Sequence, residues 1–132
     1  MNQLFKLKGM NPWILGMAVG ANFILSVVIL VASFLVVPNA SQYKDLLQLV
    51  TMVFYFIGPF LIGWFAGRMA ADLRGASYGL LGAIGGAIPV IPLVVSGGIY
   101  GLMLILVALA GGFNGGVLSM RNRVRRKRDN DV

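Results

Sequence analysis

Long apolar stretches dominate the chain, and a few short polar segments separate them. No charged residue occurs from Asn11 to Val37, and a helix needs only about 20 apolar residues to cross a hydrocarbon core roughly 30 Å thick. Pro12 suits the first turn of a helix, where its missing amide costs nothing, and Pro38 opens a polar turn. We therefore predict one transmembrane span at about 12–37 and a second at about 46–66.

The second half of the chain has the same character over a greater length. From Gly75 to Met120 there is no charged residue, and this stretch is too long for one crossing, so it must hold two helices and a turn. Ser96-Gly97-Gly98 is the best turn in it. This divides the stretch into spans at about 76–95 and 99–118.

Composition supports a membrane protein, because 58% of the 132 residues are hydrophobic, only 11% are charged, and mean hydropathy is +0.86. Such a chain cannot hide its apolar surface from water. We predict an all-α fold: a single domain at 1–120 that forms an integral membrane bundle of four transmembrane helices, followed by a basic cytoplasmic tail at 121–132. Gly58-Pro59 should bend the second span, and Pro89 and Pro92 should bend or break the third.

The basic residues predict the orientation of the bundle. Cytoplasmic flanks of membrane proteins carry an excess of Lys and Arg, and with four spans both termini and the middle loop share one side. That side would hold ten of the eleven basic residues, and the other side only Lys44. The ten are Lys6, Lys8, Arg68, Arg74, Arg121, Arg123, Arg125, Arg126, Lys127 and Arg128. We therefore expect a cytoplasmic N-terminus and C-terminus. Aromatic residues agree, with Trp13, Trp64 and Tyr78 at the inner boundary and Tyr43 and Tyr100 at the outer one.

Small residues recur at intervals that bring helix backbones close together. Helix association in lipid depends largely on van der Waals contact along such faces. The helix-packing candidates are Gly63, Gly67, Gly75, Gly79, Gly82, Gly86, Gly111 and Gly115. Packing within the monomer is the first interpretation of this pattern, and a face that binds a partner or another copy is the alternative.

A polar stripe runs along the first span, because Asn22, Ser26 and Ser33 are offset by four and seven positions and share one helical face. We expect these residues to form interhelical hydrogen bonds, with Gln48, Thr51 and Tyr55 of the second span and Asn114 of the fourth as similar candidates. A path for a polar solute is the alternative. No charged residue lies within the predicted spans, whereas ion-coupled transporters and proton relays usually place one at membrane depth.

The residue types argue against enzyme chemistry. The chain has no cysteine and no histidine, which excludes thiolate chemistry, imidazole general bases and the commonest ligands of zinc and haem. Its four carboxylates lie in loops, helix ends or the tail, and no two are placed as an acid and base pair. They are Asp45, Asp72, Asp129 and Asp131. We predict no catalytic residues, no cofactor and no metal site.

The tail combines six basic residues with a position directly after the fourth span. The lipid-headgroup candidates are Arg121, Arg123, Arg125, Arg126, Lys127 and Arg128. Basic residues near an anionic membrane surface contribute roughly 1 kcal/mol each. Nucleic acid is the less favoured partner, because no aromatic residue interrupts the run to stack on bases.

The stretch Ile62-Gly63-Trp64-Phe65-Ala66-Gly67-Arg68, followed by Gly75-Ala76-Ser77-Tyr78-Gly79-Leu80-Leu81-Gly82, resembles a pattern in small four-helix bacterial membrane proteins of uncharacterised function. The resemblance implies a multi-pass protein of the bacterial inner (cytoplasmic) membrane and implies no activity. Size and helix number are also similar to small multidrug-resistance transporters and dual-topology fluoride channels. The former need a membrane-embedded glutamate that is missing here, and the strong basic bias argues against the latter.

These observations together favour a non-catalytic accessory or structural subunit. It would pack through glycine-rich helix faces against copies of itself or in a larger membrane complex, with membrane lipids as further partners. The alternative is a small oligomeric channel or transporter that uses the Asn22 stripe and the proline-bent spans. A third interpretation is a tether that binds the lipid surface through the basic tail.

Overall fold

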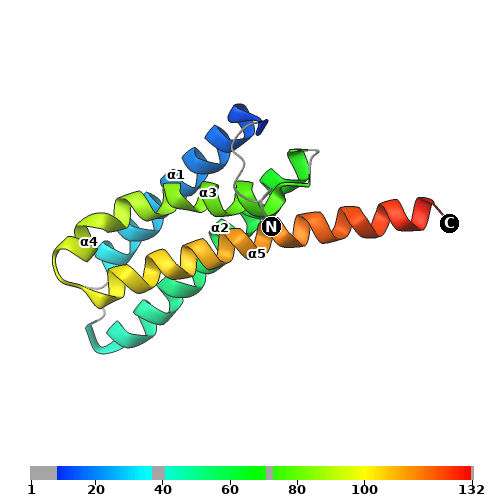
Figure 1. Ribbon diagram of the computed structural model, residues 1–132. Coiled ribbons are helices and arrows are strands. Elements are labelled where there is room, and N and C mark those ends of the chain that lie inside the picture. The colour runs from blue at the N-terminus through cyan, green and yellow to red at the C-terminus, as the bar shows by residue number, and fades with distance from the viewer. Residues whose placement is uncertain (1–8, 37–40, 71–72, 132) are drawn as a thin grey trace.

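The computed structural model describes residues 9–36, 41–70 and 73–131, and the described part is helical (Figure 1). The helices in chain order are α1 (Pro12–Val36), η2 (Ser41–Tyr43), α2 (Lys44–Met69), α3 (Gly75–Ala87), η3 (Ile88–Val90), α4 (Ile91–Val95) and α5 (Ile99–Asn130). Within the described residues, four segments are long and apolar enough to cross a membrane: α1, α2, the α3–α4 segment, and α5. The length and composition of these helices are those of a multi-pass membrane protein.

The bundle is built around α2 and α3. Both α1 and α5 pack on these two helices, and α2 and α3 also contact each other. At one end of the bundle, here called the basic end, α2 ends and α3 begins near Arg68 and Arg74. At the other end, here called the turn end, α4 connects to α5. The last part of α5 extends well beyond the other helices at the basic end (Figure 1).

The fourth helix is much longer than the predicted span of 99–118. Helix α5 has 32 residues and is therefore about 48 Å long, against a hydrocarbon core of roughly 30 Å. After Gly116 the sequence contains neither glycine nor proline, and arginine and lysine are good helix formers, so nothing ends the helix where the charges begin. Lys127 and Arg128 in the last turn also favour the helix dipole. The described part of the predicted tail is thus mostly a helical extension of the bundle.

Two prolines divide the third span as the sequence predicts. The α-helix ends at Ala87, a short 3₁₀ segment contains Pro89, and α4 contains Pro92. Each proline lacks the amide that a continuous α-helix needs. The turn that follows α4 contains Gly97, whose backbone is in the left-handed region with φ +86°. The amides of Gly97 and Gly98 donate hydrogen bonds to the carbonyls of Val94 and Leu93, respectively. Glycine adopts this conformation without strain.

The core consists of two hydrophobic clusters, one toward each end of the bundle. The cluster toward the turn end contains Leu30, Tyr55, Val90, Leu104 and Ala108. The cluster at the basic end contains Ile14, Ala18, Ala66 and Tyr78. Tyr78 differs from the interfacial anchor that its position suggested: its side chain is 0% exposed, and its hydroxyl accepts a hydrogen bond from the Asn11 amide at 2.6 Å. It stabilises the start of α1 against α3.

Candidate functional site

Paired glycines on α5 allow this helix to fit between α2 and α3. A methyl group at Gly111 or Gly115 would overlap the carbonyl oxygen of Phe56 or Phe60 on α2, respectively. The next residue of each pair, Gly112 or Gly116, faces the backbone of α3 in the same way. Because the groups in contact are backbone, side-chain rotation cannot make room for a larger residue. Glycine at these positions therefore sets the distance between the helices.

The glycines of α2 and α3 complete the same contact. Gly63 lies against Gly79 and the α5 backbone, and Gly67 lies against Gly75 and the Ser119 side chain. Gly75 and Gly79 in turn face α5. Three helices therefore meet at the basic half of the bundle with almost no side chain between them.

A second glycine face of α3 packs on α1. Gly82 faces Ala18, and Gly86 makes ordinary van der Waals contact with Asn22. Of these three glycines, Gly85, which the sequence pattern did not single out, lies closest to α1, against the backbone of Val19. With these contacts, all eight glycine candidates lie against other helices of the same chain. They leave no glycine of that set for a partner to use.

The outer side of α1 is different. A methyl group at Gly16 or Gly20 would meet nothing within 4 Å. Their neighbours on this side, including Met17, Phe23 and Ile24, are exposed apolar residues. This side has the composition expected for contact with lipid.

The polar stripe of α1 is engaged in hydrogen bonds inside the bundle. The Ser26 hydroxyl donates to the Gly86 carbonyl at 2.8 Å and lies 2.5 Å from the Tyr55 hydroxyl. Since Ser26 has one proton, the Tyr55 hydroxyl is the donor between the two. Ser26 thus joins α1 to both α2 and α3. Ser33 lies 3.1 Å from the Thr51 hydroxyl of α2 and donates to Ile29 of its own helix at 2.8 Å.

Asn22 is the least satisfied residue of the stripe. Its side chain is 2% exposed, and its Nδ2 donates to the Ala18 carbonyl at 3.0 Å. Its Oδ1 has no hydrogen-bond partner among the described residues. Ser26 and Ser33 of the stripe therefore connect α1 to neighbouring helices, whereas the Asn22 amide bonds within α1.

Two hollows lie at the turn end, a larger one between α1 and α2 and a smaller one that Leu93 of α4 and Tyr100 of α5 also line. They have volumes of about 350 and 200 Å³, and Ser33, Leu47 and Thr51 line both of them. Most of the remaining lining residues are apolar, apart from Lys44, Gln48 and Tyr100 at the smaller hollow. Their composition resembles the lipid-facing surface around them.

The basic end contains a larger and strongly charged hollow, here called the basic groove. It has a volume of about 450 Å³ and lies between the end of α2 and the extended part of α5. Its lining residues are Arg68, Ser119, Asn122, Arg123, Arg125, Arg126 and Asp129. Four guanidinium groups and one carboxylate give it a net charge of +3.

Helical spacing creates this groove. Ser119, Arg123 and Arg126 follow one another at intervals of four and three residues, so they share the face of α5 that points toward α2. The Arg123 guanidinium donates to the Arg68 carbonyl. This bond satisfies one of the carbonyls that the last turn of α2 leaves without an intrahelical partner. It also places a cation at a helix C-terminus, where the helix dipole favours it.

Arg68 is held in place by an aromatic ring. Its guanidinium carbon lies 4.9 Å from the centroid of the Trp64 ring, one turn earlier on α2. This distance is within the range of a cation–π interaction. The indole therefore restrains the arginine that forms the α2 side of the groove.

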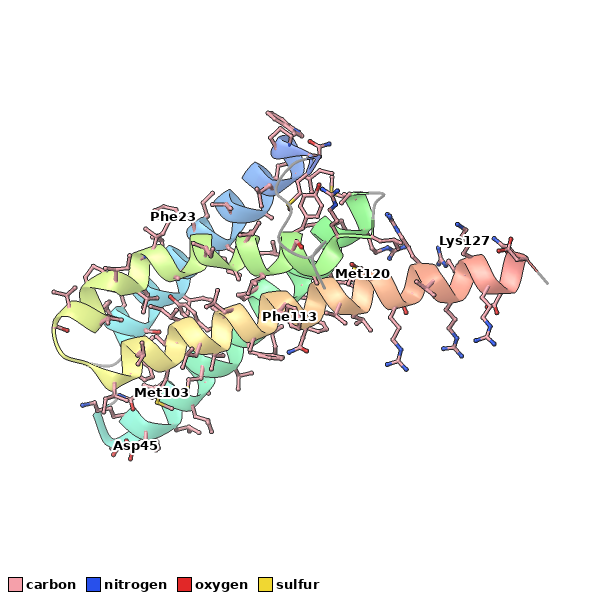
Figure 2. The ribbon with its side chains drawn as sticks, viewed as in Figure 1. Phe23, Asp45, Met103, Phe113, Met120 and Lys127 are labelled. Carbon is pink, nitrogen blue, oxygen red and sulfur yellow. The ribbon has the colours of Figure 1, made fainter. Side chains whose placement is uncertain are left out.

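The six lipid-headgroup candidates separate into two sets. Arg123, Arg125 and Arg126 line the groove, whereas Arg121, Lys127 and Arg128 are not among its lining residues. Figure 2 shows charged side chains on opposite sides of α5 beyond Met120, with Lys127 away from the bundle. Arg68 was not predicted as a member of the site. The predicted topology could have indicated it, because it puts the ends of the second and fourth spans on the same side.

Comparisons with protein-family models, curated proteins and solved structures found no match. The fold and composition therefore define the class of this chain without a family: a multi-pass α-helical membrane protein with four candidate membrane-spanning helices in its described part.

Proposed function

We propose that this chain is a non-catalytic accessory subunit of the bacterial inner membrane, with both ends in the cytoplasm. The glycine-packed bundle anchors it, and the extended part of α5 is its docking surface for an acidic partner in a larger membrane complex. This proposal keeps the accessory role predicted from the sequence and moves the contact surface from the glycines to the basic helix.

The observation that supports it most is the continuity of α5. One helix runs from Ile99 to Asn130 and carries six basic residues past the end of the bundle. A helix satisfies its own backbone hydrogen bonds, so it can hold these charges in a fixed array in water. An array of fixed charges favours recognition of a partner with complementary charge, beyond the topological role of basic residues.

The interior of the bundle supports an anchor more than a pore. At the basic half, Gly79 and Gly112 bring α3 and α5 into backbone contact. Toward the middle, the Ser26 hydroxyl is hydrogen-bonded to Tyr55 of α2 and to the Gly86 carbonyl of α3. A conducting path through a single bundle would have to separate these contacts.

The test is gentle detergent extraction at native expression level, followed by native mass spectrometry. We expect the chain to co-migrate with a defined larger complex. Val124→Pro should release it, because proline breaks the helix without removing a charge, whereas the matched Val124→Ala variant should keep the complex. A lone monomer or a symmetric homo-oligomer would overturn the proposal. Flux of a solute through proteoliposomes containing the homo-oligomer would then favour the channel.

A further inference from the structure

The basic groove lies at the level where the apolar surface of the bundle ends. On α2, exposed Phe65 and Met69 flank Arg68 in the last turn. On α5, partly exposed Leu118 comes directly before Ser119, the first lining residue of the groove. In a bilayer this boundary is the depth of the lipid phosphates. A lipid whose chains lie against the bundle would therefore bring its headgroup to the groove.

We infer that the basic groove binds the headgroup of an anionic lipid that carries two phosphate groups. The inference rests on the proposed placement of the basic end at the cytoplasmic membrane surface, and it assigns the groove side of α5 to lipid. The proposed protein partner would use the outward side, which carries Arg121 and Arg128.

Charge selects two phosphates over one. Arg123 is already bonded to the Arg68 carbonyl, and the other charged residues of the groove, three arginines and Asp129, carry a net charge of +2. A headgroup with one phosphodiester would leave one of these charges unmatched, whereas two phosphodiesters match both. Arginine also suits this chemistry, because its planar guanidinium donates two parallel hydrogen bonds to phosphate oxygens.

The volume of the groove also fits a headgroup with two phosphates. Its volume of about 450 Å³ lies within the range of sites that hold whole small molecules. Arg125 and Arg126 lie on the α5 side and Arg68 on the α2 side, so two phosphates can be bound by separate arginines. Basic hollows between membrane helices on the cytoplasmic side commonly bind lipids with several phosphates.

Two contacts hold part of the groove in its binding shape. Trp64 restrains Arg68, and the Arg68 carbonyl restrains Arg123. Fewer rotamers then have to be fixed when a ligand binds. Asp129 acts in the opposite direction, because its carboxylate repels a phosphate. Its removal should strengthen binding.

The experiment uses the full chain in lipid nanodiscs and counts bound lipids by native mass spectrometry. Cardiolipin, with two phosphates, is compared with twice the molar amount of phosphatidylglycerol, so that total lipid charge is equal, and phosphatidylcholine is the neutral control. We expect retention of cardiolipin at equal charge, weakening as ionic strength rises, and about five-fold tighter binding by Asp129→Asn.

Matched variants separate a built groove from diffuse charge. Arg68→Gln/Arg126→Gln and Arg121→Gln/Arg128→Gln each remove two positive charges, but only the first pair lines the groove. We expect the first pair to weaken cardiolipin binding about 30-fold, equivalent to about 1 kcal/mol per arginine, and the second pair to change it about two-fold. The unfolding midpoint of both variants in detergent checks that the fold is retained.

Three results would overturn the inference: equal losses in both variant pairs, equal retention of the two anionic lipids at equal charge, or tighter binding of a single-stranded RNA oligomer than of cardiolipin. Pyrophosphate that binds as tightly as cardiolipin without any lipid would assign the groove to a soluble phosphate ligand. None of these results bears on co-migration with a complex, so the accessory role is tested separately.

Discussion

Replacing Gly79 by alanine tests how closely the helices of the bundle pack. The new methyl group would overlap the carbonyl oxygen of Gly112 and lie 2.9 Å from its carbonyl carbon and 3.2 Å from the Gly116 nitrogen. All three atoms belong to the backbone of α5, so no rotamer change can relieve the overlap. The two helices must move apart.

The cost follows from the lost contacts. When a gap of roughly 0.5–1 Å opens, each atom pair across the interface loses about a quarter to a half of its roughly 0.1–0.2 kcal/mol. About 40 such pairs, as many as one buried leucine makes, would together lose about 2 kcal/mol. This agrees with the roughly 1–3 kcal/mol that an added methylene costs in packed protein cores. We therefore expect Gly79→Ala to lower the free energy of unfolding by about 2 kcal/mol, or about 30-fold in the folded to unfolded ratio.

Gly20 provides the matched control. The same methyl group on α1 meets nothing within 4 Å, and alanine has the higher intrinsic helix propensity. Gly20→Ala should therefore unfold at the same midpoint as the parent protein or slightly later. The assay is reversible unfolding by SDS in mixed micelles, followed by circular dichroism. Equal effects of the two substitutions, within about 0.5 kcal/mol, would refute close backbone contact as the basis of packing.

Two further predictions concern the polar stripe and the α5 extension. Ser26→Ala should lower the free energy of unfolding by about 1 kcal/mol more than Ser33→Ala in the same assay. The reason is that the Ser26 hydroxyl links three helices, whereas the Ser33 hydroxyl donates within its own helix. A larger loss for Ser33→Ala would contradict this assignment. Val124→Pro should reduce the circular dichroism signal at 222 nm and lower the free energy of unfolding by no more than about 1 kcal/mol. The exposed Val124 lies beyond the bundle, so only the bond of Arg123 to the Arg68 carbonyl is disturbed. Val124→Ala is its control, and a larger loss for the proline variant would show that more of the extension stabilises the bundle.

The positions of the spans could be predicted because two local features of the sequence determine them, namely the length of each apolar stretch and the residues that end a helix. Apolar length fixes how many crossings the chain makes, and the Ser96-Gly97-Gly98 turn was found because a glycine ends a helix at low cost. Pro89 and Pro92 likewise break the third span for a local reason, the missing amide. Each of these features depends only on residues close in sequence.

The end of α5 and the role of Tyr78 could not be read in the same way. The switch from apolar to basic residues predicts where the fourth span ends but not where the helix ends. Polar residues end only the contact of the helix with lipid, and a helix continues until something breaks it. Tyr78 was assigned to the membrane boundary by its residue type. It is buried because the small residues around it on α3 let α1 approach closely enough to cover its ring.

The glycine pattern was recognised without its partners. Spacing identified Gly111 and Gly115 as packing residues, but their contact with Phe56 and Phe60 depends on which helices are neighbours. The packing of the whole bundle determines which helices are neighbours, and a local sequence pattern does not contain this information. The same reason applies to Arg68, which enters the basic groove only once α2 and α5 lie side by side.

Cysteine labelling tests the central claim, a four-span bundle with its basic end in the cytoplasm, most directly. The chain has no cysteine, so single cysteines can be placed at exposed, uncharged positions without further changes: Gln42 and Ser96 at the turn end, and Leu73 and Asn130 toward the basic end. A membrane-impermeant maleimide should label the first two in intact cells and the last two only after permeabilisation. Labelling of Leu73→Cys or Asn130→Cys in intact cells, or protection of Gln42→Cys and Ser96→Cys, would contradict the account.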